Sequence, residues 1–177
     1  VQNGLELDGE NGQRQNVTLI DEEQTPTATL SVERDSIEEN VGTTTSIVTV
    51  AISAPSGLAS AITIAASGTA TDGVDYRLSG TVINIPAGQT KGSVTLSALG
   101  DLLNETDETI ILEIVGVTNV TEAGTQKQVV TILNDDLQPT VTLSVASATL
   151  AEDTGATSTN VIATLSAVSS LEVSVKL

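Results

Sequence analysis

Carboxylates crowd one short stretch of this chain, residues 100–108, which reads Gly-Asp-Leu-Leu-Asn-Glu-Thr-Asp-Glu and contains no lysine or arginine. Apolar, strand-like runs flank the stretch on both sides, at 93–99 and 109–115. Like charges about 5 Å apart repel each other by roughly 0.8 kcal/mol per pair even in water. The stretch is therefore either a solvated acidic loop or one side of a cation site.

Composition restricts which cation the chain could bind. The 177 residues include no histidine and no cysteine, which excludes a Ser-His-Asp triad and every metal ligated by His or Cys. A metal would have to be a hard ion bound by oxygen atoms. Ca²⁺ fits better than Mg²⁺, because it accepts about six to eight oxygens in flexible geometry. The expected cofactor is therefore Ca²⁺.

Charge and composition also exclude several functions. The formal net charge of −17, from 23 acidic and 6 basic residues, argues against binding to nucleic acid or to an anionic membrane. The sequence lacks the run of about 18 apolar residues that a membrane-spanning helix needs, so we expect no membrane insertion. A glycosidase built on Asp101 and Glu105 is conceivable, but sugar sites usually use aromatic platforms and Tyr76 is the one aromatic residue. We therefore expect that the chain is not an enzyme.

The sequence repeats itself at an offset of 113 residues (139 − 26). Residues 17–26 match 130–139, and the offset continues without a gap, with 12 identities in 29 positions between 26–54 and 139–167. Self-similarity at a fixed period indicates a tandem array. With no methionine in the sequence, we expect a piece of a longer protein. Its expected parts are the C-terminal tail of one repeat (1–25), a complete repeat (26–138) and the N-terminal strands of a third (139–177).

The complete repeat consists of short runs rich in Val, Ile and Thr, with turn signals such as Asp72-Gly73 and Pro86-Ala-Gly88 between them. β-branched residues at a period of two favour strands. The pattern and the length of 113 residues predict an all-β fold, an immunoglobulin-like antiparallel β-sandwich. Seven strands are expected, at 27–33, 45–54, 61–67, 81–85, 91–99, 108–117 and 126–133.

Alternating strand directions would bring most of the acids to one end of this sandwich, the end that the first strand reaches. The loops at the other end would hold one acid, Glu122. Solubility alone would distribute carboxylates over both ends, so the asymmetry favours a metal site over the solvated-loop alternative. The eleven acids expected together are Asp35, Glu38, Glu39, Asp72, Asp75, Asp101, Glu105, Asp107, Glu108, Asp135 and Asp136. Of these, Asp35 and Asp72 are also interpreted as turn-forming residues.

Five ordered motifs in residues 26–138 resemble the Calx-beta domain. They are Ile37-Glu-Glu-Asn-Val-Gly42, Gly68-Thr-Ala-Thr-Asp-Gly-Val-Asp-Tyr76, Ile85-Pro-Ala-Gly-Gln89, Asp101 with Glu105-Thr-Asp-Glu-Thr109, and Val130-Thr-Ile-Leu-Asn-Asp-Asp136. The resemblance implies an immunoglobulin-type sandwich of the kind found in sodium–calcium exchangers and in large extracellular proteins. In the calcium-binding members, carboxylates at the end of the sandwich bind a cluster of Ca²⁺ ions. A cadherin repeat is the nearest rival, because Asn134-Asp-Asp-x-x-Pro139 is similar to its linker.

Carried over position by position, the resemblance implies seven metal ligands: Glu39, Asp75, Asp101, Glu105, Glu108, Asp135 and Asp136. Two departures imply fewer ions or weaker binding, since Asp101 stands where the exchanger domain has three acids and Asn134 stands where it has an aspartate. The aromatic core residues of the family are aliphatic here, at Ile85 and Ile110. In the flanking pieces, ligand-type positions without their partner loops are held by Asp21, Glu22, Glu23 and Glu152.

The expected function is a calcium-binding structural or adhesive repeat of a long extracellular or cell-surface protein, which we expect to be bacterial. Ca²⁺ would stiffen the end of the sandwich and the joint to the next repeat. The expected partners are neighbouring repeats of the same chain and other copies that meet through strand edges or sandwich ends. Two alternatives stay open. One is a Ca²⁺ sensor that relays occupancy to a neighbouring domain, and the other is a metal-independent, self-assembling sandwich.

Overall fold

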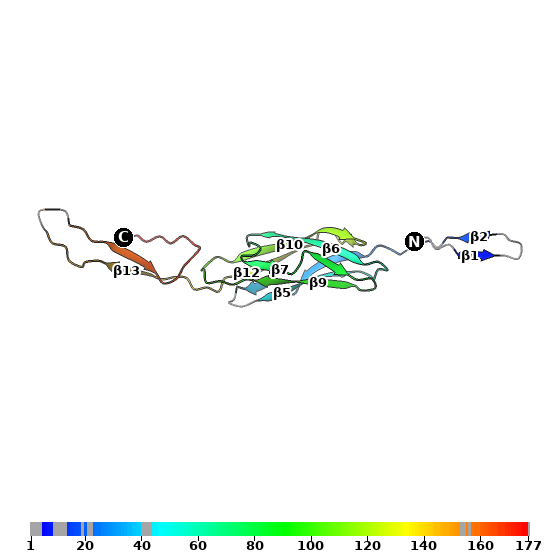
Figure 1. Ribbon diagram of the computed structural model, residues 1–177, viewed down its shortest axis with the longest axis horizontal. Helices are drawn as coiled ribbons and strands as arrows, with labels where there is room; N and C mark the ends of the chain where they lie inside the picture. Colours follow the sequence, from blue (N-terminus) through cyan, green and yellow to red (C-terminus); the bar gives the residue numbers. More distant parts are fainter. Residues whose placement is uncertain are drawn as a thin grey trace.

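The computed structural model describes residues 5–8, 14–18, 20, 23–39, 44–152, 155 and 157–176. Every regular element among these residues is a β-strand, which confirms the predicted all-β class. Two five-stranded sheets face each other as a sandwich (Figure 1). Within the described part of the chain we find no apolar helix of the length needed to traverse a bilayer.

The two sheets are built from residues 27–133. The first sheet has the strand order β4 (Ser36–Glu38), β12 (Lys127–Leu133), β10 (Glu108–Thr118), β6 (Ser60–Gly68), β8 (Val82–Ile85). The second has the order β11 (Thr121–Glu122), β3 (Thr27–Val32), β5 (Thr45–Ile52), β9 (Lys91–Ala98), β7 (Tyr76–Leu78). Neighbours are antiparallel except for the β12–β4 and β11–β3 pairs, which are parallel.

Aliphatic side chains on alternate positions of these strands form the core. On β5, Val48, Val50 and Ile52 are buried, and the residues between them are less buried. They belong to one cluster with buried Ile, Leu and Val side chains of both sheets. Tyr76, the single aromatic residue, is 4% exposed and also belongs to this core. Period-two alternation places the outward residues in solvent, so the sequence pattern alone selects this packing.

All seven predicted strands are present, with ends that differ by at most two residues. The sequence analysis missed three short strands, β4, β7 and β11. It was also wrong about two acids of the first loop, because the chain does not turn back after β3. Instead, it changes sheets at Asp35, whose carbonyl accepts a hydrogen bond from the Thr131 amide (2.8 Å), and continues as β4. Asp35 therefore lies at this crossing and Glu38 lies in a strand, and neither is in an end loop.

Strand directions bring five parts of the described chain to one end of the sandwich, the acidic pole: Glu39, Thr44 and residues 69–75, 99–107 and 134–138. Backbone hydrogen bonds join these segments, from Ala98 to Thr44, from Leu99 to Asp75 and from Glu39 to Leu133. The opposite end, the entry pole, contains loops 53–59, 86–90 and 119–126 and the incoming segment 23–26. In Figure 1 the acidic pole points toward β13 and the entry pole toward β1 and β2.

A hairpin follows the acidic pole, formed by β13 (Val141–Val145) and β14 (Val161–Leu165). Its register repeats that of β3 and β5 at the sequence offset: Val141 pairs with Leu165, as Ala28 pairs with Ile52, and 141 − 28 = 165 − 52 = 113. A second hairpin, β1 (Leu5–Asp8) with β2 (Arg14–Val17), precedes the sandwich. The predicted domain boundaries stay a prediction, but the strands that they place in a third repeat have the pairing that β3 and β5 have in the sandwich.

We predict that Gly68→Ala destabilises the sandwich by at least about 2 kcal/mol. Gly68 ends β6 with φ +131°, and a Cβ there would collide with the Thr109 carbonyl oxygen. A strained backbone and overpacking each cost about 1–3 kcal/mol. Urea unfolding followed by far-UV circular dichroism measures the change in the free energy of unfolding. Gly80→Ala is the matched control, because its Cβ would meet no atom nearer than Val94 Cγ1 at 3.9 Å. Equal stability of the two variants would contradict this account.

Candidate metal centre

Three carboxylates converge at the acidic pole from three separate segments. One oxygen from each of Glu39, Asp75 and Glu105 lies within 4.8 Å of the other two. Glu39 follows β4, Asp75 precedes β7 and Glu105 lies between β9 and β10. Glu39 is 5% exposed and Asp75 is 8% exposed, and acidic side chains are rarely buried to this degree without a partner. The fold therefore concentrates negative charge where water screens it least.

No basic side chain neutralises this charge in the described part of the chain. The ion pair found there, between Lys127 Nζ and Glu113 Oε2 at 3.2 Å, lies on β12 and β10, outside the pole loops. Burial raises the pKa of Glu39 to about 7, and the charges of Glu105, Asp101, Asp75 and Asp136 add to the shift. Glu39 is therefore about half protonated at pH 7 when no cation is bound.

Glu108 joins the cluster through Asp75. Burial raises the pKa of Glu108 to about 7, and a side-chain hydrogen bond with Asp75 and the charges of Asp75 and Glu105 contribute. The Thr71 amide donates a hydrogen bond to Asp75 Oδ2 at 2.6 Å. Glu108 therefore holds a proton part of the time near pH 7, and a divalent ion could replace that proton.

Asp136 supplies a further oxygen at the same pole. Its Oδ2 is buried and has no hydrogen-bond partner, although the residue as a whole is only partly buried. Burial raises the pKa of Asp136, and the charges of Asp135 and Asp101 add to it. A buried acceptor without a donor is costly and uncommon in proteins, so this oxygen is a second sign that the pole is arranged for a cation.

Asp101 and Asp135 lie at the exposed rim of the cluster. Asp101 Oδ1 accepts a hydrogen bond from the Leu103 amide at 2.6 Å, a local turn that places its charge near Glu39 and Asp136. The structure therefore brings Glu39, Asp75 and Glu105 together, attaches Glu108 through Asp75, and adds Asp101 and Asp136 at the range of charge interactions. Asp135 precedes Asp136 in the sequence, and its charge acts on Asp136.

Three residues that the sequence analysis did not name as ligands hold the loops of the site in place. Asn134 Oδ1 accepts a hydrogen bond from the Glu105 amide (3.1 Å), and its Nδ2 donates to the Asp136 carbonyl (3.1 Å). Asn104, 8% exposed, donates to the same carbonyl (3.2 Å). Asp107 Oδ1 accepts from the Asn134 amide (3.1 Å). The resemblance marks Asn134 as the place of an absent acid, and the structure shows that it connects the loop of Glu105 to the segment of Asp136.

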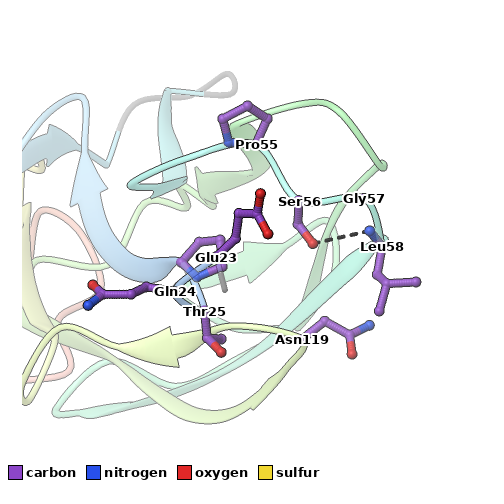
Figure 2. Close-up of a pocket in the computed structure, with 9 residues that line it drawn as sticks. Glu23, Gln24, Thr25, Pro55, Ser56, Gly57, Leu58 and Asn119 are labelled. Carbon is purple, nitrogen blue, oxygen red and sulfur yellow. Dashed lines mark hydrogen bonds between the residues drawn. The ribbon is translucent and has the colours of Figure 1, made fainter. Parts of the chain in front are cut away.

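The flanking acids that the structure describes lie outside the carboxylate cluster. Asp21 and Glu22 fall outside the described residues, Glu23 lies at the entry pole and Glu152 is exposed beyond β13. A cavity of about 470 Å³ at the entry pole is lined by residues 23–26, 55–58 and Asn119 (Figure 2). Glu23 is its one acidic residue, so the cavity and the carboxylate cluster occupy opposite poles.

The raised pKa values predict how stability depends on pH when no divalent cation is bound. Glu39 and Glu108 have folded-state pKa values of about 7, above the ordinary value of 4.5. A raised folded-state pKa stabilises the protein below the unfolded-state value, and this contribution is lost as the pH rises through the folded-state value. In a chelator, the melting temperature should therefore fall between pH 5 and pH 8.

Glu39→Gln removes one of these charges and should reduce the fall, with a gain of about 1–2 kcal/mol at pH 8 after allowance for solvent screening. Glu38→Gln is the matched control, since it removes the same charge from the exposed neighbouring position. Melting curves at several pH values measure both variants. Identical pH dependence in the two would show that Glu39 is not held in a repulsive site.

Comparisons with known proteins bear on the fold. No protein-family model and no curated protein matches the chain. Among solved structures, the apo form of the Calx CBD1 domain matches with a TM-score of 0.50 at 20% identity, over 62% of this chain and 99% of that one. The calcium-binding domain CBD12 of CALX1.1 matches with a TM-score of 0.50 at 22% identity, over 58% of this chain and 42% of that one. CBD12 of CALX1.2 gives 0.49 at 22% identity, over 57% and 41%. The chain thus spans less than half of the CBD12 structures, and what it has in common with these proteins is the fold of a Calx-beta-like β-sandwich.

Proposed function

We propose that the acidic pole binds Ca²⁺ and that the chain is a structural module of a long extracellular or cell-surface protein. The observation that carries this proposal is the convergence of Glu39, Asp75 and Glu105 within 4.8 Å, with the unpartnered Oδ2 of Asp136 at the same pole. One of the similar structures, CBD12 of CALX1.1, is a calcium-binding domain, which supports the same chemistry for this chain.

The donor set fits a hard ion of flexible coordination. Glu39, Asp75, Glu105 and Glu108 would supply most of the oxygens, and Asp136 and the rim residue Asp101 would complete the set. Ca²⁺ accepts about six to eight oxygens at about 2.3–2.6 Å, whereas Mg²⁺ prefers a strict octahedron and retains its waters. Bound Ca²⁺ would displace the protons of Glu39 and Glu108 and convert the repulsion between loops into attraction through a shared ion.

The position of the pole suggests the mechanical role. The chain leaves the sandwich through residues 134–138, which carry Asp135 and Asp136, and continues into the β13–β14 hairpin (Figure 1). An ion bound here would restrict the segment that connects one sandwich to the next. In an end-to-end array, such ions would turn a flexible chain of modules into a stiffer spacer. No catalytic role is proposed.

A Ca²⁺ sensor is the second candidate, and one observation favours it. The C-terminal segment makes hydrogen bonds to Asn104, the residue beside Glu105. Occupancy of the metal site could therefore change how the following segment sits. A spacer should bind Ca²⁺ at millimolar concentrations and change mainly in stability. A sensor should respond at micromolar concentrations with a change of shape that small-angle X-ray scattering detects.

Calcium should raise the melting temperature of the chain. At a Ca²⁺ concentration of 100 times the dissociation constant, binding adds about 2.7 kcal/mol to the free energy of unfolding.

Glu105→Gln removes a charge from the centre of the cluster and should weaken binding at least about tenfold, the equivalent of about 1.4 kcal/mol. Calorimetric titration and thermal melts measure the two effects.

Glu33→Gln is the matched control for this experiment. It removes the same charge at an exposed position just after β3, outside the residues of the acidic pole, and should bind Ca²⁺ as the unaltered chain does. If excess Ca²⁺ leaves the melting temperature of the unaltered chain unchanged, the acids are solvated loops and the proposal is wrong.

A further inference from the structure

Within the described residues, the hydrogen bonds between the acidic pole and the turn that follows β14 all go to one residue, Asn104. The Asn104 carbonyl accepts hydrogen bonds from the Ser169 hydroxyl (3.2 Å), the Ser170 amide (3.3 Å) and the Ser170 hydroxyl (3.3 Å). Asn104 and Ser169 form a parallel β-bridge. The Asn104 side chain donates to the carbonyl of Asp136, in the connecting segment (3.2 Å). Asn104 thus contacts two places beyond the sandwich strands, the connecting segment at Asp136 and the turn that follows β14.

Both of these places have equivalents at the entry pole of the sandwich. An offset of 113 relates Ser169 to Ser56, Ser170 to Gly57 and Asp136 to Glu23. The turns also have the same internal hydrogen bond, since the Leu171 amide donates to Ser169 Oγ and the Leu58 amide donates to Ser56 Oγ, each at 3.1 Å.

The anchoring of the two turns to their strands is equivalent as well. The Thr140 amide donates to Ser166 Oγ and the Thr27 amide to Ser53 Oγ, each at 2.9 Å. Because the two turns have the same local hydrogen bonds at the same spacing, they have the same form. The turn that contacts Asn104 at the acidic pole therefore has a counterpart in the turn 55–58 at the entry pole.

That counterpart lines the cavity of the entry pole. The segment 23–26 forms one side and the turn 55–58 forms the other, with Asn119 below them (Figure 2). The volume of about 470 Å³ is sufficient for a short loop of side chains. A Cβ added at Gly57 would meet no atom within 4 Å, so the Gly57 backbone is open to an approaching chain.

We propose that this cavity is a docking site for the loop 103–105 of another sandwich of this kind, placed immediately before it in a head-to-tail array. The Asn104 carbonyl of that sandwich accepts hydrogen bonds from the Gly57 amide and the Ser56 hydroxyl, and its side-chain amide donates to the Glu23 carbonyl. Glycine at position 57 provides the amide donor and lacks the hydroxyl that Ser170 adds at the other joint.

The two poles of one sandwich are therefore complementary to each other. Contacts of this head-to-tail kind extend an array without closing it. The inference rests on the end-to-end arrangement in the proposed function but does not require the metal. Asn104 belongs to this joint and lies next to Glu105 in the sequence.

Disulfide trapping in an extended chain tests the docking. The gapless repeat allows residues 26–138 to be duplicated in frame within the full chain. Residues 136–138 of the first copy then precede the second copy, at the positions that residues 23–25 occupy before the first copy. Bridged strand residues have Cα atoms about 5 Å apart, within the range that a disulfide spans, and the chain contains no cysteine. Asn104→Cys in the first copy with Ser56→Cys in the second should form a disulfide under mild oxidation.

The matched control pairs the same Asn104→Cys with Ala87→Cys of the second copy, an exposed position of the entry pole outside the cavity lining. The Ser56 pair should oxidise at least about tenfold faster, because docking raises its effective concentration. Peptide mass spectrometry identifies each disulfide. Equal rates for the two pairs would overturn the docking.

A second variant leaves Asn104 intact. Gly57→Phe in the second copy fills the cavity, at a position where an added Cβ meets no neighbouring atom, and should increase the radius of gyration measured by small-angle scattering. The same substitution in the first copy, which has no sandwich before it, should leave that radius unchanged. Equal effects of the two substitutions would also overturn the docking.

Repeating the trapping in Ca²⁺ and in chelator separates this inference from the proposed function. Fast trapping in both conditions without any effect of Ca²⁺ on the melting temperature would leave the docking correct and the metal site wrong. A rise in melting temperature with slow trapping would leave the metal site correct and the docking wrong.

Discussion

Mutual repulsion among carboxylates at one pole is the constraint on which the rest of this molecule depends. The strand directions of the sandwich bring Glu39, Asp75 and Glu105 to within 4.8 Å of one another from three segments. No cation from the protein offsets their charge in the described part of the chain. Protons on Glu39 and Glu108, whose pKa values are about 7, relieve part of the repulsion. A divalent ion would relieve it more completely, because it attracts all the carboxylates at once.

The loops that carry these acids are held by amide side chains and backbone bonds. Asn134 links the loop of Glu105 to the exit segment of Asp136, and Asn104 binds the same exit segment and the turn of the next hairpin. The residues that carry the repelling charges, that hold the loops and that form the joint are therefore neighbours in the sequence: Asn104 with Glu105, and Asn134 with Asp136. A change in the charge of the pole would act directly on the residue that contacts the following segment.

Much of this architecture could be predicted from the sequence because it follows from simple periodicity. Alternating Val, Ile and Leu residues specified all seven main strands, and strand direction then placed Glu39, Asp75 and Glu105 at one pole. Short edge strands such as β4 and β7 escaped prediction because three residues are too few to show a period. The crossing at Asp35 escaped for the same reason, so two acids were assigned to the wrong place.

The hydrogen-bonding roles of Asn104 and Asn134 could not be predicted either. An asparagine in a loop can bond to many backbone groups, and only the three-dimensional approach of residues 104–107 to 134–136 selects one. The family resemblance indicates only that Asn134 stands where the exchanger domain has an acid. Its side chain also makes hydrogen bonds to the Glu105 amide and the Asp136 carbonyl, and the resemblance does not predict these bonds. The positions of the clustered carboxylates follow from strand pattern and direction, whereas the positions of the residues that hold the loops follow from contacts between loops.

Proton release on Ca²⁺ binding tests the central claim most directly. Two groups with pKa values of about 7 are half protonated at pH 7, so a bound ion should release about one proton in total. Calorimetric titrations in buffers of different ionisation enthalpy measure this number. The account predicts about one proton at pH 7, a value near zero at pH 9, and a reduced value in Glu39→Gln. Calcium binding without proton release at pH 7 would contradict it.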